Sequence, residues 1–344
     1  MTKNSGISVG IVGLGRMGLN HIRAVQTLGY VVKDICDKNS EALDKAMLLI
    51  ENVEVRASSD FDYFFSKLDV DLLIISTTAD SRFEILNRAL SLNVKLILCE
   101  KPILSSAHEI EEIELSARKS TSKVAVNHQM RFMEIYSKVV ELKKSRDLGK
   151  ITSMSVSGAN FGLGMNGTHY FEAFRFVTGT EIYSISGQID SELLPNPRGA
   201  VFADYSGSLL GMTQDNVKMF MDFSAGAGHQ AVVVYNFRNG KIIINEHQGK
   251  LYFSKRASDF MELPTNRYAL EGEYAEYSIA PVDSLNPTIE VIRSLVENSN
   301  FPSLENGIHA IKCALATILS SEKNGSPTLL DDENIKLLTT LRWP

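Results

Sequence analysis

Three short groups of residues combine the side chains that oxidation of an alcohol would need. They are the glycine-rich turn Gly13-Leu14-Gly15-Arg16-Met17-Gly18, the triplet Glu100-Lys101-Pro102 after an apolar run, and the later segment Asn166-Gly167-Thr168-His169. A glycine turn of this spacing can accept the pyrophosphate of a dinucleotide. A lysine or a histidine within hydrogen-bond reach of a hydroxyl can accept its proton. The combination predicts hydride transfer between a nicotinamide cofactor and an alcohol.

The glycine turn directly follows the apolar run of residues 7–12 and opens a helical pattern. The first glycine allows the tight turn, the second lets the backbone approach a phosphate, and the third lets the helix pack on the strand. Phosphates there would meet backbone N–H groups and the positive end of a helix dipole. The cofactor contacts predicted from this turn are Gly13, Gly15, Arg16, Met17 and Gly18. The alternative is a glycine turn that holds no ligand.

Two further strand ends offer polar groups to the same cofactor. Asp37 ends the second predicted strand and could accept hydrogen bonds from a ribose diol, and its charge would repel a 2′-phosphate. NAD is therefore favoured over NADP, although Lys38 beside it keeps NADP open. Ser76 and Thr77 end the fourth strand, where their hydroxyls could line the nicotinamide ribose. Ordinary turn chemistry after a strand is the alternative for these two residues.

Lys101 follows the fifth predicted strand, at the edge where open α/β sheets place their ligands. It could accept the hydroxyl proton if burial and the positive nicotinamide ring lower its pKa, or it could stay charged and polarise the oxygen. Glu100 could pair with Lys101 or contact the cofactor ribose. A surface lysine at a strand end is the alternative.

Residues after the sixth strand and at the start of a later helix are candidate substrate contacts. Arg131, in the segment 127–132, could bind a carboxylate or phosphate in bidentate fashion, or it could pair with a structural acid. His169 opens a helix and titrates near neutrality, which suits acid–base work, but a buried histidine with a hydrogen-bond partner is the alternative. The predicted substrate contacts are Lys101, His128, Arg131, Asn166 and His169.

The elements that must position these residues alternate between strands and helices in the first third of the chain. Apolar runs rich in Val, Ile and Leu are typical of strands buried on both faces. They cover residues 7–12, 30–36, 53–56, 71–76, 94–99 and 123–127, with helical patterns at 16–28, 40–51, 60–68, 81–92 and 106–120. Ser106 and Glu109 form a capping-box pattern at the start of the last helix. The alternation predicts a doubly wound parallel sheet of the Rossmann type.

The pattern changes after Asn127, where helices are predicted at 131–145 and 168–178 on either side of a strand at 151–160. Residues 182–280 read mostly as strands with polar turns, and Asn239-Gly240 is a hairpin signal. Helices return at 287–299, 305–322 and 332–341. We therefore predict an NAD(P)-binding domain over 1–122 and, over 123–344, an α+β domain with a mainly antiparallel sheet that binds substrate.

The bulk properties are those of a globular protein with two domains. The chain has 344 residues, which exceeds one typical domain, a net charge of -6 and three cysteines. No basic stripe predicts nucleic-acid binding, and no apolar run approaches the roughly 20 residues of a membrane span. The cysteines are far apart and show no disulfide or zinc spacing, so no metal site is predicted. The N-terminus shows no secretory signal, which favours a cytoplasmic location.

Together these residues resemble the Gfo/Idh/MocA oxidoreductase family, whose founding members include glucose-fructose oxidoreductase and inositol dehydrogenase. The glycine turn, Asp37, the Glu100-Lys101-Pro102 triplet, the segment 127–132 and Gly167-Thr168-His169 carry the resemblance in order over nearly the whole chain. It implies a Rossmann domain followed by a domain with a large open sheet, through which members often pair, so a homodimer or homotetramer is expected. It assigns a proton-relay role to Lys101 and an acid–base or substrate-orienting role to His169.

Two departures from the family pattern concern catalysis. Met165 lies four residues before His169, where dehydrogenases of the family usually carry an Asp. Glu172, three residues after the histidine, lies on a similar helix face and could orient it. Thr77-Thr78 replaces the usual Thr-Pro, and Arg82 lies where the family often has a histidine. Cofactor binding is expected to tolerate these changes, whereas the identity of the acid–base group depends on them.

The expected activity is NAD-dependent hydride transfer to or from a hydroxyl or keto carbon of a sugar or sugar derivative. Arg82 and Arg131 would suit an acidic or phosphorylated substrate, such as a nucleotide sugar used in surface-polysaccharide synthesis. One alternative is a family member that uses tightly held NAD in glycoside cleavage without net redox change. Another is a cofactor-binding sensor or partner protein without catalysis, which Met165 keeps open.

Overall fold

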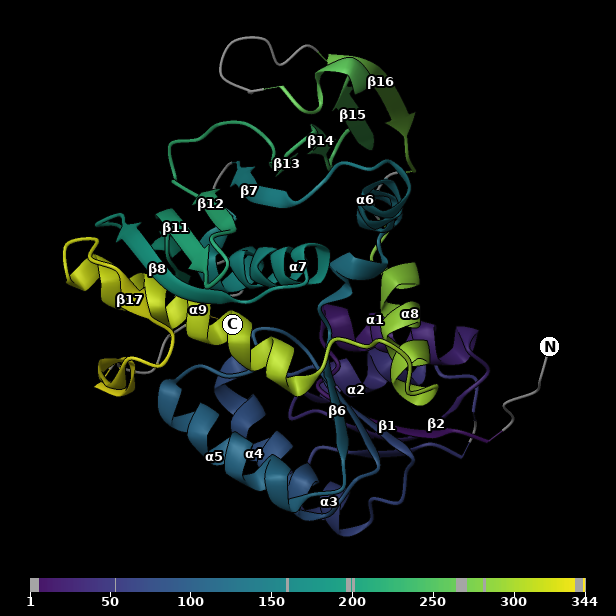
Figure 1. Cartoon of the computed structure of the whole chain (residues 1–344). Helices are drawn as coiled ribbons and strands as arrows, with labels where there is room; N and C mark the ends of the chain where they lie inside the picture. Colours follow the sequence, from purple (N-terminus) through teal and green to yellow (C-terminus); the bar gives the residue numbers. More distant parts are fainter. Residues whose placement is uncertain are drawn as a thin grey trace. The chain divides into compact units, whose positions relative to one another are not determined.

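The structure is a computed structural model of the full chain. It describes residues 6–52, 54–158, 161–195, 199, 202–263, 271–280, 283–337 and 343 (Figure 1). Two compact units share the chain. The first contains residues 1–129, 284–311 and 339–344, and the second contains residues 130–283 and 312–338. The domain limits predicted from the sequence, 1–122 and 123–344, stay a prediction.

The first unit is built on a six-stranded parallel sheet in the order β3-β2-β1-β4-β5-β6. Its strands are β1 (Ser8–Val12), β2 (Val31–Cys36), β3 (Arg56–Ser58), β4 (Leu72–Ile75), β5 (Leu96–Cys99) and β6 (Lys123–Val126). The connecting helices are α1 (Arg16–Thr27), α2 (Ser40–Met47), α3 (Phe61–Ser66), α4 (Ala79–Ser91) and α5 (Ala107–Lys119). The predicted Rossmann sheet is thereby confirmed.

The central strands of this sheet are buried on both faces. Every residue of β4 and β5 is buried, as expected for apolar runs that helices cover on either side. The predicted capping box at the start of α5 is confirmed, because Ser106 and Glu109 each accept a hydrogen bond from the other's backbone N–H. Helix α8 (Leu285–Val296), from a distant part of the chain, packs on α1 within the same unit.

The strand order reverses between β1 and β4, which creates the switch point where open α/β sheets bind their ligands. At the carboxyl end, β1 leads into Gly13, β4 into Ser76 and β5 into Glu100. Because parallel strands end at the same edge, the fold gathers the glycine turn, the Ser76-Thr77 pair and the Glu100-Lys101 pair there.

The second unit is built on a nine-stranded sheet in the order β16-β15-β14-β13-β7-β12-β11-β8-β17. Its strands are β7 (Ile151–Ser157), β8 (Ile182–Ile189), β11 (Gly207–Thr213), β12 (Lys218–Asp222), β13 (Val232–Phe237), β14 (Gly240–Asn245), β15 (Lys250–Arg256), β16 (Glu271–Ser278) and β17 (Thr328–Leu329). Neighbouring strands are antiparallel except β7 and β12, so the predicted mainly antiparallel sheet is confirmed. The hairpin signal at Asn239-Gly240 joins β13 to β14. A separate small ladder pairs β9 (Leu194–Pro195) with β10 (Ala203–Asp204).

Helical segments complete the chain. They are the 3-10 helices η1 (Gln129–Phe132), η3 (Ser258–Phe260) and η4 (Glu333–Leu337), the π-helix η2 (Gly162–Gly167), and the α-helices α6 (Glu134–Ser145), α7 (Thr168–Thr178) and α9 (Leu304–Glu322). Helix α7 has the limits predicted from the sequence. Of the helix predicted at 332–341, η4 covers part as a 3-10 helix, and residues 338–341 lie outside the described residues.

The two faces of the nine-stranded sheet differ in exposure. Leu251, Ile244, Val233 and Val156 are buried and lie opposite one another across β15, β14, β13 and β7. On the other face a cross-strand row runs through Tyr252, Ile243, Val234, Ser155, Phe220 and Leu210. Tyr252 and Phe220 in this row are 41% and 43% exposed. The sheet therefore presents an apolar stripe on its second face.

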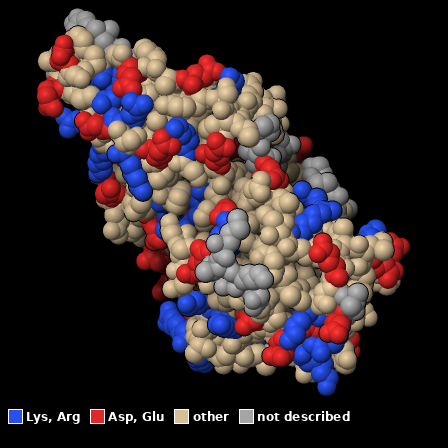
Figure 2. Space-filling view, turned by 90° about the vertical axis from the view of Figure 1, so that its right-hand side faces the viewer, with Lys and Arg blue, Asp and Glu red and all other residues tan. Residues whose placement is uncertain are grey.

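Charged side chains of both signs are mixed on one face of the molecule (Figure 2). Figure 2 shows Lys and Arg interspersed with Asp and Glu over the face in view. Such mixing differs from the basic stripe that is the usual footprint of a nucleic-acid binder. Within the described part of the chain, no helix combines the length and apolar character needed to cross a bilayer.

Candidate functional site

The glycine turn is tightly fitted to the strands around it. Gly13 has a φ of +86° and donates its N–H to the Cys36 carbonyl at 2.8 Å. A Cβ at Gly13 would lie 2.6 Å from the Thr77 nitrogen, and one at Gly18 would lie 2.1 Å from the Gly13 carbonyl oxygen. Both positions therefore need glycine for backbone packing.

The start of α1 is open where the rest of the turn is crowded. Gly15 is the N-cap of this helix, no side chain caps the helix, and the first turn carries no acidic residue. A Cβ at Gly15 would meet no atom within 4 Å among the described residues. Free backbone N–H groups at a helix start favour an anion. The geometry of the turn thus fits the pyrophosphate of a dinucleotide.

Asp37 is bound to the same turn. Its carboxylate accepts the Leu14 N–H at 2.6 Å and the Asn39 N–H at 2.9 Å. The first bond fixes the turn, and the second holds the chain that enters α2. Each carboxylate oxygen can accept more than one hydrogen bond, so the predicted contact with a ribose diol is compatible with both bonds.

Ser76 and Thr77 take different roles at the end of β4. The Ser76 hydroxyl donates to the Gly13 carbonyl at 2.6 Å, so it locks the glycine turn. The Thr77 hydroxyl is buried and has no hydrogen-bond partner among the described residues. A buried hydroxyl without a partner is costly, and a bound ribose or nicotinamide amide would supply one. This orphaned group at the strand end fits the predicted cofactor.

Glu100 is the centre of a buried polar network. His21 Nε2 lies 2.8 Å from Glu100 Oε1, and the Asn127 side-chain amide donates to the same oxygen at 2.7 Å. The other oxygen accepts the Lys101 N–H at 3.3 Å. Burial favours the neutral acid, but these hydrogen bonds and the nearby positive charge lower the pKa of Glu100 to about 2. His21 carried no signal in the sequence, because its partner lies 79 residues away.

Lys101 is half-buried directly after this network, and its peptide bond to Pro102 is cis. Arg82 lies nearby in the first turns of α4. Its guanidinium donates to the backbone carbonyls of Thr77 and Pro102, and the residue is 2% exposed. The arginine that the sequence suggested for an acidic substrate is therefore engaged with the protein's own backbone.

His169 lies in the first turn of α7, directly after the π-helix η2, and is 9% exposed. Asp204 supports this entry to the helix. Its carboxylate accepts the N–H groups of Gly164 and Met165, each at 2.8 Å. π-Helical turns are rare and often occur at functional sites. Sequence reasoning missed Asp204, since a carboxylate 35 residues after the histidine gives no local signal.

The sequence suggested that Glu172 could orient His169, but the Glu172 carboxylate pairs with two arginines instead. Glu172 Oε1 accepts hydrogen bonds from Arg131 and, at 3.3 Å, from Arg175. Glu172 and Arg131 are both buried. This is the structural pairing that the sequence left open for Arg131.

The other two predicted substrate contacts differ in burial. His128 is buried, and its backbone N–H donates to the Val126 carbonyl at 2.6 Å. Asn166 is exposed, and its side-chain amide donates to the Phe161 carbonyl at 3.1 Å. Contact of either residue with a substrate stays a prediction.

A second carboxylate of the second unit, which is half-buried, was also missed by sequence reasoning. Glu246, after β14, accepts hydrogen bonds from the hydroxyls of Tyr136 and, at 3.2 Å, of Tyr170. Burial raises the pKa of Glu246, although these hydrogen bonds oppose the shift. Burial also raises the pKa of both tyrosines well above the ordinary value. The cluster ties α6 and α7 to the sheet.

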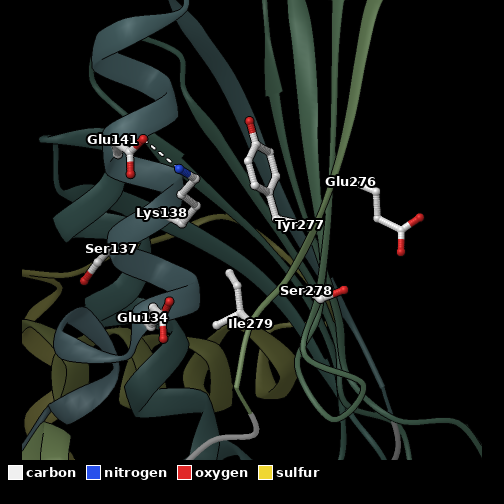
Figure 3. A pocket seen from close by; sticks show the side chains of 8 residues that line it. All are labelled: Glu134, Ser137, Lys138, Glu141, Glu276, Tyr277, Ser278 and Ile279. Atoms are coloured by element: carbon white, nitrogen blue, oxygen red, sulfur yellow. Dashed lines mark hydrogen bonds and ion pairs between the residues drawn. The ribbon is translucent and has the colours of Figure 1, made fainter.

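A pocket of about 450 Å³ lies between α6 and β16 in the second unit (Figure 3). Lys138 lies over the Tyr277 ring, 4.7 Å from its centroid, and pairs with Glu141 at 2.7 Å. The aromatic face that could receive a ligand cation is thus covered by the chain's own ammonium group.

In the described part of the chain, no group of three or more His, Cys, Asp or Glu residues is arranged to hold a metal ion.

Comparison with known proteins agrees with this architecture. The profile of a family described as "Oxidoreductase family, NAD-binding Rossmann fold" matches residues 7–128. Inositol 2-dehydrogenase 1 of Paenarthrobacter aurescens (strain TC1) is 26% identical over 265 residues, which cover 72% of this chain and 76% of the relative. Over residues 7–128 the chain therefore matches the Gfo/Idh/MocA oxidoreductase family. The resemblance found in the sequence is confirmed, and NAD is the cofactor that this family implies.

Two solved structures share the fold over nearly the full chain. A levoglucosan dehydrogenase in complex with NADH and levoglucosan has a TM-score of 0.76 and 16% identity, covering 95% of this chain and 100% of that chain. The transcriptional regulator Gal80p from Kluyveromyces lactis has a TM-score of 0.76 and 14% identity, covering 95% of this chain and 92% of that chain. Because an enzyme and a regulator match equally well, these likenesses show the fold alone.

Proposed function

We propose that the chain is an NAD-dependent dehydrogenase that moves a hydride to or from a CH–OH carbon of a neutral polyol or sugar. The observation that carries the proposal is the sheet edge of the first unit. There an uncapped helix start, a buried hydroxyl on Thr77 and the side chain of Lys101 follow the ends of β1, β4 and β5. NAD, when bound, supplies the hydride acceptor or donor at nicotinamide C4.

Lys101 is the group that we propose to exchange the hydroxyl proton. Its neighbour Glu100 is unsuited to that task, because a carboxyl with a pKa of about 2 is a weak base near neutral pH. The Glu100 oxygens are also occupied by His21, Asn127 and the Lys101 N–H. Lys101 is half-buried. When NAD is bound, its positive nicotinamide ring close to the lysine would lower the pKa of the ammonium group.

His169 is the residue that we propose to orient the substrate hydroxyl. Met165, which replaces the family's usual Asp, offers no carboxylate to the histidine. Asp204 instead supports the backbone at this position, because its carboxylate accepts the Met165 N–H in the turn before α7. Lys101 therefore carries the proton step, and His169 is expected to affect orientation and pH dependence.

The substrate class follows from where the arginines are engaged. Arg82 donates to two backbone carbonyls and Arg131 pairs with Glu172, so the two guanidinium groups expected to bind a phosphate already have partners. This arrangement favours a neutral polyol over the nucleotide sugar considered from the sequence. An inositol 2-dehydrogenase among the relatives and a levoglucosan dehydrogenase among the structures of similar fold agree with that class.

A homo-oligomer formed through the apolar stripe of the nine-stranded sheet is a further part of the proposal. The stripe runs across six strands and exposes two aromatic side chains, Tyr252 and Phe220. Phe220→Glu should shift the molar mass in light scattering from a dimer or tetramer to a monomer, whereas Lys218→Glu on the same strand should not. An unchanged mass for Phe220→Glu would contradict this interface.

The cytoplasmic location stays a prediction.

The enzyme assay follows NAD reduction with myo-inositol, levoglucosan and a UDP-hexose. For the polyol that reacts, Lys101→Met should lower kcat by about 100-fold or more, because proton transfer contributes roughly that factor. Lys95→Met, at the amino end of the same strand, is the matched control and should leave kcat unchanged. If Lys101→Met kept wild-type turnover, the assigned proton role would be wrong.

The assay also separates the other candidate functions. NADH binding without turnover of any polyol or nucleotide sugar would favour a sensor or partner protein without catalysis, and the transcriptional regulator Gal80p shares this fold. Cleavage of a glycoside with NAD unchanged in amount would favour the glycosidase-type mechanism. Turnover of the UDP-hexose alone would overturn the proposed neutral substrate.

A further inference from the structure

Arg82 is a buried cation at the edge of the sheet that carries Lys101. It is the fourth residue of α4, and its side chain lies inside the first unit instead of on the helix surface. Arg88 on the same helix shows the ordinary arrangement, because its side chain is exposed and pairs with Asp62 at 2.5 Å. Burying a guanidinium is costly unless its hydrogen bonds are satisfied, so the hydrogen bonds of Arg82 are expected to have a structural or functional role.

Those contacts join two loops. Arg82 Nη2 donates to the Thr77 carbonyl at 2.5 Å, and Arg82 Nη1 donates to the Pro102 carbonyl. Thr77 follows β4 and Pro102 follows β5, and the two strands are neighbours in the sheet. One planar group therefore connects the loop with the orphaned hydroxyl to the loop with Lys101.

We propose that Arg82 is a positioning residue that fixes the Lys101 loop and the Thr77 loop in one mutual geometry. The inference rests on the proposed function, since it assigns a task toward the same reaction. A guanidinium suits the task because its fork offers several donors in a fixed plane, whereas the ammonium of a lysine is a point donor on a flexible stem.

The network of Glu100 supports the same geometry from the other side. Glu100 precedes Lys101 and is held by His21 and Asn127, whereas Pro102 follows Lys101 and is held by Arg82. The backbone is thus anchored immediately before and immediately after the lysine. The positive charge of Arg82 also helps to keep the Glu100 carboxyl ionised.

Kinetics of Arg82→Met and Arg82→Lys, with Arg88→Met as control, test this role. For the polyol that the wild type oxidises, Arg82→Met should lower kcat about 100-fold with a much smaller change in KM, as expected when a reacting group is misplaced by about 1 Å. Arg82→Lys should lie between wild type and Arg82→Met, because an ammonium can reach one carbonyl. Arg88→Met should match the wild type.

Amide hydrogen exchange of the ligand-free protein gives a readout that does not depend on activity. Arg82→Met should speed exchange in residues 76–78 and 100–104, and Arg88→Met should not. Circular dichroism shows whether Arg82→Met is folded, and Arg82→Lys supplies the comparison if it is not. Wild-type exchange in both segments of the folded Arg82 variants would overturn the proposal. If the wild type neither binds NADH nor oxidises a polyol, the proposed function fails, and exchange still decides whether Arg82 fixes the loops.

Discussion

The Glu100→Gln substitution is expected to remove a pH-dependent part of the stability of the first unit. In the folded chain the pKa of this carboxyl is lowered from an ordinary 4.5 to about 2, although burial opposes the shift. At about 1.4 kcal/mol per pH unit, the difference corresponds to about 3 kcal/mol. Glutamine keeps the shape of the side chain and loses the charge that the His21 and Asn127 hydrogen bonds stabilise.

The sign follows from the lowered pKa. An acid that binds its proton less tightly in the folded chain adds stability that is complete above the unfolded pKa near 4.5. That contribution is lost as the pH falls toward 2. The wild type should therefore exceed Glu100→Gln in unfolding free energy by about 3 kcal/mol at pH 6, and the difference should shrink between pH 5 and pH 3.

Urea unfolding followed by tryptophan fluorescence measures this difference. Trp343 is the only tryptophan of the chain, belongs to the first unit and is 1% exposed. Asp332→Asn is the control, because the pKa of this surface carboxyl is also lowered to about 2 but the residue belongs to the second unit. A difference between wild type and Glu100→Gln that stays constant from pH 6 to pH 3 would refute the reasoning.

Three further substitutions have expected outcomes. Gly15→Val should weaken NADH binding at least about tenfold in a fluorescence titration, with an unchanged melting temperature, since its Cβ meets no described atom within 4 Å. Gly18→Ala should lower the urea-unfolding free energy by about 1–3 kcal/mol, because its Cβ would lie 2.1 Å from the Gly13 carbonyl oxygen. Glu246→Gln should flatten the pH dependence of thermal unfolding above the ordinary carboxyl pKa of 4.5. The raised pKa of Glu246 makes the wild type lose stability as the pH rises through it. A wild-type result for any of the three would contradict the corresponding contact.

The local part of the cofactor site could be predicted from the sequence. The glycine turn is a motif of six consecutive residues at a strand-to-helix junction, so its conformation follows from neighbours along the chain. The capping box of α5 is local in the same way, since Ser106 and Glu109 are three residues apart. Strand and helix periodicity likewise predicted the Rossmann sheet, because each strand of a doubly wound sheet carries its own apolar run.

The partners of the buried charges could not be predicted, because they come from distant segments. Arg82 reaches the Pro102 carbonyl 20 residues away, and Arg131 reaches Glu172 across 41 residues. In sequence an arginine that binds a ligand looks the same as one that binds the protein's own backbone. The packing of helix α8 on α1 could not be predicted for the same reason, because the two helices lie more than 250 residues apart in the chain.

Titration of the purified protein with NADH and with NADPH, followed by nicotinamide fluorescence, tests the central claim most directly. We predict clearly tighter binding of NADH, which Asp37→Ala should weaken, because the carboxylate holds the Leu14 N–H and is the group that we expect to accept the ribose hydroxyls. Asp44→Ala, on the helix after this turn, is the control and should bind NADH like the wild type. Absence of binding for both nucleotides would contradict a working dinucleotide site at Gly13–Gly18.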